Sequence, residues 1–406
     1  MLPDVMPSAL LSPGKLISHL VADHQIRAAL DALQGSVNDV VALTMKIQQI
    51  PAPTFAEAER AAFVQSQFEA MGLRDVTRDE LDNVYGRFPG QSPQQTPPVI
   101  VSAHTDTVFP ADTDLTLWQD GRLLYGPGIG DNSTGVAGLI TLAQTFLTFN
   151  LRPQADIWFV ANVGEEGMGN LCGMKAVCQR FGPEARYVVI EGGFFGQISH
   201  QAIGVRRFRI EVETQGGHSW GSFGQPSAIH QLAHLITAIE SLTLPQHPKT
   251  TYNVGVIEGG RSVNTIAPSA SMLLDLRSED GEVLAQLVEQ VMALVQEQIQ
   301  PANDKRPFVA ITVKEVGNRP AGYIPRQSPL VSLAEAALRH VGQDKPFFTT
   351  SSTDANIPLS LGAEAICLGL TGSGNAHRTD EYMDPTWLPQ GLSQLLLVLL
   401  AAGGFQ

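Results

Sequence analysis

The chain has 406 residues, of which 43% are apolar and 16% charged, a composition typical of a globular protein with two or so domains. Its 40 acidic and 26 basic residues give a net charge of −14, which argues against nucleic acid as a partner. The three cysteines form no Cys-x-x-Cys pair, so both a disulfide framework and a thiolate zinc site are disfavoured.

Neither end of the chain carries a pattern for export or membrane insertion. Residues 1–20, "MLPDVMPSALLSPGKLISHL", lack the basic start and the continuous apolar run of a signal peptide. The apolar run "LLLVLLAA" at 395–402 is far shorter than the roughly 20 residues of a membrane-spanning helix and predicts the buried face of a closing helix. We therefore expect a cytoplasmic protein with reduced thiols and no membrane partner.

Helical patterns dominate the first 73 residues. Residues 16–33 are amphipathic and predict an additional packing or interface helix within an extra N-terminal segment, 1–36. Two more helical patterns lie in residues 37–73, on either side of "PAPT". Proline ends the first of these, and Thr54 is placed to cap the second.

Four short runs are apolar on both of their faces and alternate with helical segments such as "GVAGLITLAQTFL". This alternation predicts an α/β domain with a mixed, largely parallel sheet and helices on both faces. The runs lie at 97–103, 156–163, 185–190 and 363–370.

Residues 204–316 have a different pattern, in which apolar and polar residues alternate along the expected strands. Strand, helix, strand, strand, helix and strand follow one another, the order of a ferredoxin-like α+β domain with one exposed sheet face. We therefore expect this domain to be inserted into the α/β domain, which comprises residues 1–203 and 317–406. The expected strands are 208–214, 251–258, 269–278 and 308–316, and the helices are 228–242 and 281–299.

Acidic residues and histidines follow the four apolar runs. In open α/β sheets, binding sites lie at the carboxyl ends of the strands, where these side chains would meet. Each also has an ordinary explanation, such as a helix cap, a charged loop, a salt bridge or a surface histidine. The candidates are His104 and Asp106 after the first run, Asp131 where a glycine-rich loop enters a helix, Glu165 and Glu166 after the second run, Glu191 after the third and His377 after the fourth.

Two histidines and three carboxylates suit zinc or a similar divalent ion, and they are enough for two ions. Two ions bridged by a carboxylate, with a water or hydroxide between them, form the arrangement used in metal-assisted hydrolysis. Glu165 would remain beside a ligand as a general base for that water. His104 would bind metal while Asp106 accepts its other ring N–H, although a polar loop that caps the strand would show the same pair.

The motifs together resemble those of the M20 metallopeptidases, which include carboxypeptidases, aminoacylases, deacetylases and di- and tripeptidases. From about residue 37, motif order and the inserted domain cover nearly the whole chain. The resemblance implies a zinc-peptidase-like catalytic domain with an inserted lid and dimerisation domain. The matching motifs are "HTDTV" (104–108), "GPGIGDNSTG" (126–135), "EEGMG" (165–169), "IEGG" (190–193) and "GNAHRTDEY" (374–382).

The resemblance also implies a role for each candidate. Asp131 bridges the two ions, and its peptide bond to Asn132 is cis. Glu165 is implied as the general base and Asp106 as the residue that holds His104. The remaining ligands are His104 and Glu191 for one ion and Glu166 and His377 for the other.

Three residues of the inserted domain match family positions that contact substrate. His218 in "TQGGHSW" is implied to reach the active site of a partner subunit, although an ordinary loop histidine would fit this short motif too. Asn264 in "GGRSVNTIAP" and Arg277 in "LLDLRSED" are implied to bind substrate, and a surface salt bridge is the alternative for Arg277. Asp354 in "SSTDANIP" resembles a segment near the active site of tripeptidases, without an assigned role.

The predicted function is the hydrolysis of a peptide or N-acyl amide bond next to a free carboxylate, by a metal-bridging water or hydroxide with Glu165 as general base. Two zinc ions per chain are expected, with cobalt or manganese as alternatives, in a homodimer that acts on small peptides or N-acyl amino acids. Glu191 favours a carboxypeptidase or deacylase, whereas local motifs favour a tripeptidase or aminopeptidase of the same family. A catalytically silent metal-binding homologue is the alternative from another class, and the retained Glu165 argues against it. A phosphoesterase is disfavoured because arginine or lysine would be expected near the metals.

Overall fold

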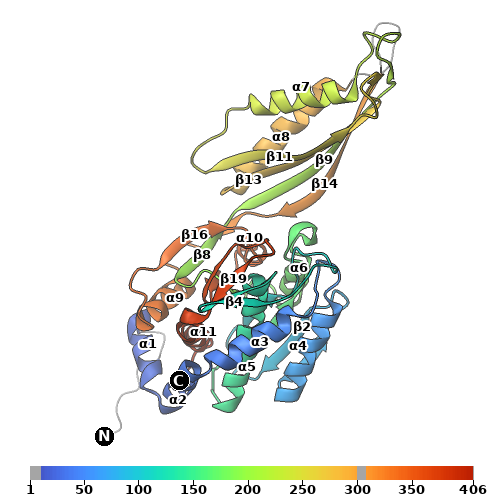
Figure 1. Ribbon diagram of the computed structural model, residues 1–406. Coiled ribbons are helices and arrows are strands. Elements are labelled where there is room, and N and C mark those ends of the chain that lie inside the picture. Colours follow the sequence, from blue (N-terminus) through green and yellow to red (C-terminus); the bar gives the residue numbers. More distant parts are fainter. Residues whose placement is uncertain (1–10, 300–307, 406) are drawn as a thin grey trace. The chain divides into compact units, whose positions relative to one another are not determined.

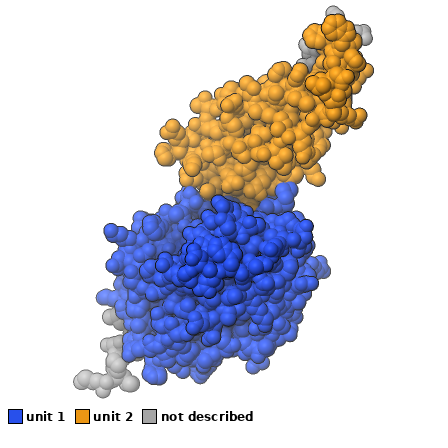
Figure 2. All heavy atoms as spheres, viewed as in Figure 1, with its two compact units in different colours: residues 1–202, 323–406 blue, residues 203–322 orange. Residues whose placement is uncertain are grey.

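The computed structural model describes residues 11–299 and 308–405. The chain divides into two compact units, unit 1 with residues 1–202 and 323–406 and unit 2 with residues 203–322 (Figure 2). Each unit has a hydrophobic core of its own. Residues 1–10, which contributed to the expectation of no signal peptide and to the segment 1–36, lie outside the described residues.

Two helices, not one, occupy the amphipathic stretch at 16–33. Helix α1 spans Pro13–Ala22 and α2 spans His24–Gly35. The break falls at Asp23, whose carboxylate accepts the backbone N–H groups of Gln25 and Ile26 and caps α2. The apolar sides of both helices join the core of unit 1, so this segment packs against the rest of the unit.

Within the described residues, unit 1 and the adjoining Gly322 form a nine-stranded mixed sheet in the order β1-β2-β6-β3-β7-β17-β8-β15. Strand β16 lies beside β8 (Figure 1). The neighbours β6, β3, β7 and β17 are parallel, and they are the four apolar runs predicted from the sequence. These central strands are almost entirely buried, as expected for a sheet covered on both faces. The strands are β1 Arg74–Arg78, β2 Val84–Phe88, β3 Val99–His104, β6 Ile157–Asn162, β7 Arg186–Glu191, β8 Gln197–Ala202, β15 Gly322–Tyr323, β16 Phe347–Ser351 and β17 Ala365–Gly369.

The helices of unit 1 form two groups. Helix α5 contacts α3, α4 and α11, and α11 also contacts α9, whereas α6 contacts α10. Both α5 and α6 pack against β6, so the α/β architecture with a helix-covered mixed sheet is confirmed. Nearly every residue of α11 is buried, as its apolar run predicted. These helices are α3 Val37–Gln48, α4 Ala58–Met71, α5 Gly135–Thr148, α6 Cys172–Phe181, α9 Pro329–His340, α10 Asn356–Ser360 and α11 Leu388–Ala402.

Two local features of unit 1 were not predicted correctly. Helix α4 has Glu57 at its N-cap position, and Thr54 donates its hydroxyl hydrogen to Asp106 at 2.9 Å, so Thr54 is not the cap. A small antiparallel sheet in the order β18-β19-β5-β4 was also not predicted. Its three-residue strands are too short for an alternating pattern. They are β4 Trp118–Asp120, β5 Leu123–Tyr125, β18 Gly372–Gly374 and β19 Tyr382–Asp384.

Unit 2 has the predicted strand and helix order. Its four-stranded sheet has the order β11-β13-β9-β14 with antiparallel pairs throughout, the topology of a ferredoxin-like domain. Helices α7 and α8 contact each other and the two inner strands (Figure 1). Two short strands, β10 Gly217–His218 and β12 Thr265–Ile266, pair separately. The main elements are β9 Gly204–Thr214, α7 Ala228–Glu240, β11 Thr250–Gly259, β13 Ser269–Ser278, α8 Gly281–Gln298 and β14 Val309–Arg319.

Candidate metal centre

Adjacent parallel strands bring two of the predicted ligands together. His104 is the last residue of β3 and Glu191 is the last residue of β7. The two strands pair in parallel, so their carboxyl ends lie at the same edge of the sheet. Both residues are more than nine-tenths buried, which fixes their side chains in the interior of the edge.

Asp131 reaches this edge from the turn before α5. The neighbouring Asn132 holds the turn against β7, since its side-chain amide donates to the carbonyl of Ile190 and its side-chain oxygen accepts the N–H of Gly192. The peptide bond between Asp131 and Asn132 is cis, as the family resemblance implied. The turn therefore places Asp131 next to the end of β7.

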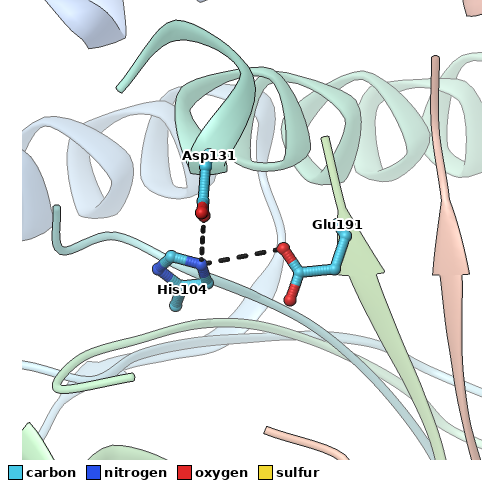
Figure 3. Close-up of side chains that lie close together, drawn as sticks. All are labelled: His104, Asp131 and Glu191. Atoms are coloured by element: carbon cyan, nitrogen blue, oxygen red, sulfur yellow. Dashed lines mark ion pairs between the residues drawn. The ribbon is translucent and has the colours of Figure 1, made fainter. Parts of the chain in front are cut away.

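His104, Asp131 and Glu191 point toward one another in Figure 3. The Nε2 atom of His104 lies 3.0 Å from Oδ1 of Asp131 and 3.8 Å from Oε2 of Glu191. Each of the three residues offers a ligand atom within 4.8 Å of the other two. This spacing is suited to one metal ion held by an imidazole and two carboxylates.

A second group shares Asp131. The other carboxylate oxygen of Asp131, Oδ2, lies 3.3 Å from Nε2 of His377, and the same nitrogen lies 3.1 Å from Oε1 of Glu166. Asp131, Glu166 and His377 again offer atoms within 4.8 Å of one another. Asp131 thus directs one oxygen to each histidine, which is the geometry of a bridging carboxylate.

The carboxylate of Asp106 contacts both His104 and the loop that carries Glu165 and Glu166. It lies 3.4 Å from Nδ1 of His104, and the backbone carbonyl of Asp106 lies 3.1 Å from the same nitrogen. Its two oxygens also accept the backbone N–H groups of Glu165 and Glu166, at 3.0 and 2.9 Å. Asp106 therefore leaves Nε2 of His104 facing Asp131 and fixes the start of the segment that carries both glutamates.

Glu165 lies next to the ligand candidates and is buried. Together with His104 and Glu166 it forms a third group of atoms within 4.8 Å of one another. It is therefore within reach of a molecule bound at the centre, as a general base must be.

The electrostatics of the centre favour positive charge. Burial, the largest effect on His104, lowers its pKa, but hydrogen bonds with Asp106, Asp131 and Glu191 outweigh it and hold the pKa well above its usual range. Hydrogen bonds with Asp131 and Glu166 raise the pKa of His377 to about 10. Burial raises the pKa of the Glu191 carboxyl, with a further contribution from Asp131. Burial also acts to raise the pKa of Asp131, but hydrogen bonds with His104 and His377 outweigh it and lower that pKa. Glu191 and the two histidines therefore bind protons more tightly than usual, and a divalent cation would displace those protons.

The three candidates from unit 2 are held by local contacts. His218 is exposed, and its Nδ1 accepts the backbone N–H groups of Trp220 and Gly221. Asn264 is also exposed and accepts the hydroxyl hydrogen of Ser262. The Nε of Arg277 lies 2.6 Å from the carboxylate of Asp275, which also pairs with Arg207.

Several buried groups around the centre were given no role from the sequence. Glu57 accepts the N–H of Gly164, just before the two glutamates, and Glu381 accepts N–H groups from the turn that carries Asp131. The Nδ2 of Asn162, at the end of β6, donates to Asp354 at 2.6 Å. Burial raises the pKa of Asp354 to about 7. Glu381 and Asp354 lie within quoted motifs, but their contacts arise only in the folded chain.

Comparison with known proteins decides the family. The model of peptidase family M20/M25/M40 matches residues 100–401, which is more than half of the chain. The chain belongs to this family. Since peptidases are hydrolases, the predicted enzyme class is confirmed, as is the predicted family.

Individual M20 relatives are distant. A peptidase M20 domain-containing protein of Schizosaccharomyces pombe is 26% identical over 62% of this chain, which spans 64% of the length of that relative. Acetylornithine deacetylase of Myxococcus xanthus is 27% identical over 87% of this chain and 93% of its own. The crystal structure of a Staphylococcus aureus tripeptidase is similar in fold, with a TM-score of 0.76 and 22% identity over 90% of this chain and 98% of its own.

The M20 chain has, in its described part, no helix with both the length and the apolar character needed to cross a lipid bilayer.

Proposed function

We propose that the protein hydrolyses a peptide or N-acyl amide bond next to a free carboxylate, with two divalent ions bound at the centre. The observation that carries this proposal is the Asp131 carboxylate, which directs its two oxygens to two different histidines. The donor set of two imidazoles and three carboxylates fits zinc, with cobalt or manganese as alternatives. Bound there, the ions would supply carbonyl polarisation and a water molecule of lowered pKa.

Each side chain of the centre in unit 1 has a separate role in this proposal. His104 and Glu191 would hold one ion, Glu166 and His377 would hold the other, and Asp131, which belongs to both groups of candidate ligands, would be shared by them. Glu165 takes the proton of the attacking water and passes it to the leaving amine. Asp106 keeps the ring of His104 in place through Nδ1.

The side chains of unit 2 bind the substrate in this proposal. Arg277 pairs with the free carboxylate because a guanidinium offers two parallel N–H donors to it. Asn264 contacts the substrate as well, and His218 polarises the scissile carbonyl in a partner subunit. Small peptides and N-acyl amino acids are the proposed substrates, and the cytoplasm is the proposed location.

A substrate screen tests the proposal. Metal-loaded protein is incubated with dipeptides, tripeptides, N-acetyl amino acids and N-carbamoyl amino acids, and released amine is measured. We expect cleavage in at least one class, loss of activity with a chelator, and recovery with zinc. Elemental analysis that finds at most one ion per reconstituted chain would contradict the dinuclear centre, and a protein with two ions and no turnover in any class would contradict the activity.

Mixing two inactive variants tests the shared site. A chain with His218→Ala and a chain with Glu165→Gln should together regain part of the activity, because a hybrid dimer contains one site with both residues intact. Each variant alone, put through the same exchange protocol, is the control. No recovery after demonstrated subunit exchange would show that His218 acts within its own chain or not at all.

A further inference from the structure

The carboxylate of Glu381 is almost completely buried and holds the turn that carries Asp131. Its Oε1 accepts the backbone N–H groups of Gly130 and Asp131, both at 2.7 Å. Its Oε2 accepts the N–H of Gly128 at 3.2 Å. Three N–H groups from four consecutive residues thus converge on one side chain, and each bond restricts the path of the backbone at the turn.

The backbone of Glu381 is attached to the same region. Its carbonyl accepts the N–H of Gly126 at 2.8 Å, and the next residue, Tyr382, pairs with Tyr125. The N–H of Glu381 donates to the carbonyl of Arg378, the residue directly after His377. Glu381 therefore links the segment that carries His377 to the turn that carries Asp131.

Close packing at Gly130 keeps the carboxylate against the turn. A Cβ atom at Gly130 would lie 3.1 Å from Oε1 of Glu381 and 2.8 Å from Cβ of Ser373. No side chain fits between the turn and Glu381, so the backbone approaches the carboxylate directly.

We propose that Glu381 is a positioning residue that fixes the Asp131 carboxylate between His104 and His377. This role rests on the proposed metal-dependent function. It adds to that function the residue that positions the bridging carboxylate of Asp131. Each oxygen of Asp131 faces a different histidine, so a change in the turn disturbs both groups at once. Loss of Glu381 should therefore weaken the binding of both ions together.

Three variants separate hydrogen bonding from general destabilisation. Glu381→Ala removes all three acceptor contacts. Glu381→Gln keeps one carbonyl oxygen, which can still accept from Gly130 and Asp131, but it turns an amide NH₂ toward the N–H of Gly128. It serves as a second variant should the alanine chain fail to fold. Asp23→Ala is the matched control, because Asp23 also accepts two backbone N–H groups in unit 1 but lies at the start of α2.

Hydrogen exchange in the metal-free protein gives the first readout. We expect the amides of the turn at 128–131 to exchange at least about tenfold faster in Glu381→Ala than in the wild type, because the local opening of the turn becomes easier. Asp23→Ala should stay close to the wild-type rate at this turn, and Glu381→Gln should do so at Gly130 and Asp131, whose acceptor it keeps. A wild-type exchange rate in Glu381→Ala would overturn the proposal that the Glu381 carboxylate restrains the turn.

Titration of zinc into the metal-free chains gives the second readout. Glu381→Ala should weaken both binding steps about 10- to 100-fold, the usual loss when a residue that orients a ligand is removed. The absorption spectrum of the cobalt-saturated protein should change in Glu381→Ala and stay unchanged in Asp23→Ala. Wild-type affinity and an unchanged spectrum in Glu381→Ala would overturn the positioning role.

Three further outcomes are decisive. If the amides of Gly130 and Asp131 exchanged as fast in Glu381→Gln as in Glu381→Ala, although glutamine keeps their acceptor, negative charge and not acceptance of the N–H groups would be the cause, and the proposal would be wrong as stated. If the wild type bound fewer than two ions, the proposed function would fail and the role at a two-ion bridge would fail with it. A wild type that binds two ions and an alanine variant that does so equally well would refute only the role of Glu381.

Discussion

The metal centre of unit 1 and the candidate substrate residues of unit 2 differ in how firmly their own unit fixes them. The side chain of His104 is 1% exposed and lies between three carboxylates, whereas that of Arg277 is 43% exposed and pairs with Asp275. His218 and Asn264 are exposed too. The fold of unit 1 thus places the buried members of its centre in advance, with His377 the exposed member at 54%. The residues of unit 2 depend on a substrate or a partner for their proposed roles.

The largest expected effect tests the chemistry of the centre. Glu165→Gln should keep the fold and both metals but lower kcat by about 10²- to 10⁴-fold, because the general base is lost. The matched variant is Glu166→Gln at the neighbouring position, which should lose metal as well as activity because Glu166 lies 3.1 Å from His377 in the second group. Kinetics and elemental analysis of both proteins give the comparison. An unchanged kcat in Glu165→Gln would remove its assigned role.

A smaller effect is expected from Asp106→Asn. An asparagine presents an amide NH₂ where the carboxylate now accepts the N–H groups of Glu165 and Glu166, so the loop should shift. We expect metal affinity to fall about 10- to 100-fold, as for other residues that orient ligands. Zinc titration measures this change, with Asp23→Asn as the control because asparagine caps a helix as well as aspartate does. Equal affinity in wild type and Asp106→Asn would show that the centre does not need this support.

The sequence predicted the central part of the fold because burial leaves a clear pattern there. The strands β6, β3, β7 and β17 are apolar on both faces, since helices cover both sides of the sheet. His104 and Glu191 end two of these strands and Glu166 follows a third closely, whereas Asp131 comes from the turn before α5 and His377 from the segment after β18. The structure brings all five of these candidate ligands together. The strands of unit 2 could also be predicted from the sequence, because β13, for example, alternates buried and partly exposed residues along its length.

The remaining features depend on contacts that sequence spacing does not encode. Edge strand β1, "RDVTR", has no buried residue and therefore no apolar pattern. Thr54 looked like a helix cap, but its hydroxyl contacts Asp106, 52 residues away along the chain. Glu381 and Gly130 are separated by 251 residues, so only the folded chain shows that one holds the other.

The substrate side of the comparison is tested at Arg277. Arg277→Lys should cost about 2 kcal/mol, roughly 30-fold in kcat/KM, for substrates with a free carboxylate, because a lysine cannot form two parallel N–H bonds to it. Substrates with an amidated carboxylate should lose little, and they serve as the control. An equal loss for both substrates would show that Arg277 supports the structure of unit 2 through Asp275 and does not bind the carboxylate of the substrate.

The smallest effect is expected for a capping residue of unit 1 that lies outside the centre. Asp23→Ala leaves the N–H groups of Gln25 and Ile26 without their side-chain acceptor, which should lower the free energy of unfolding by about 1 kcal/mol. Denaturant unfolding measures this loss, and metal affinity and kcat should remain at wild-type values. If this remote change also weakened metal binding, the centre would be sensitive to the overall stability of unit 1. The larger effects of Glu381→Ala and Asp106→Asn could then no longer be attributed to their direct contacts. Unchanged affinity at reduced stability would instead show that the centre is held by its own local hydrogen bonds.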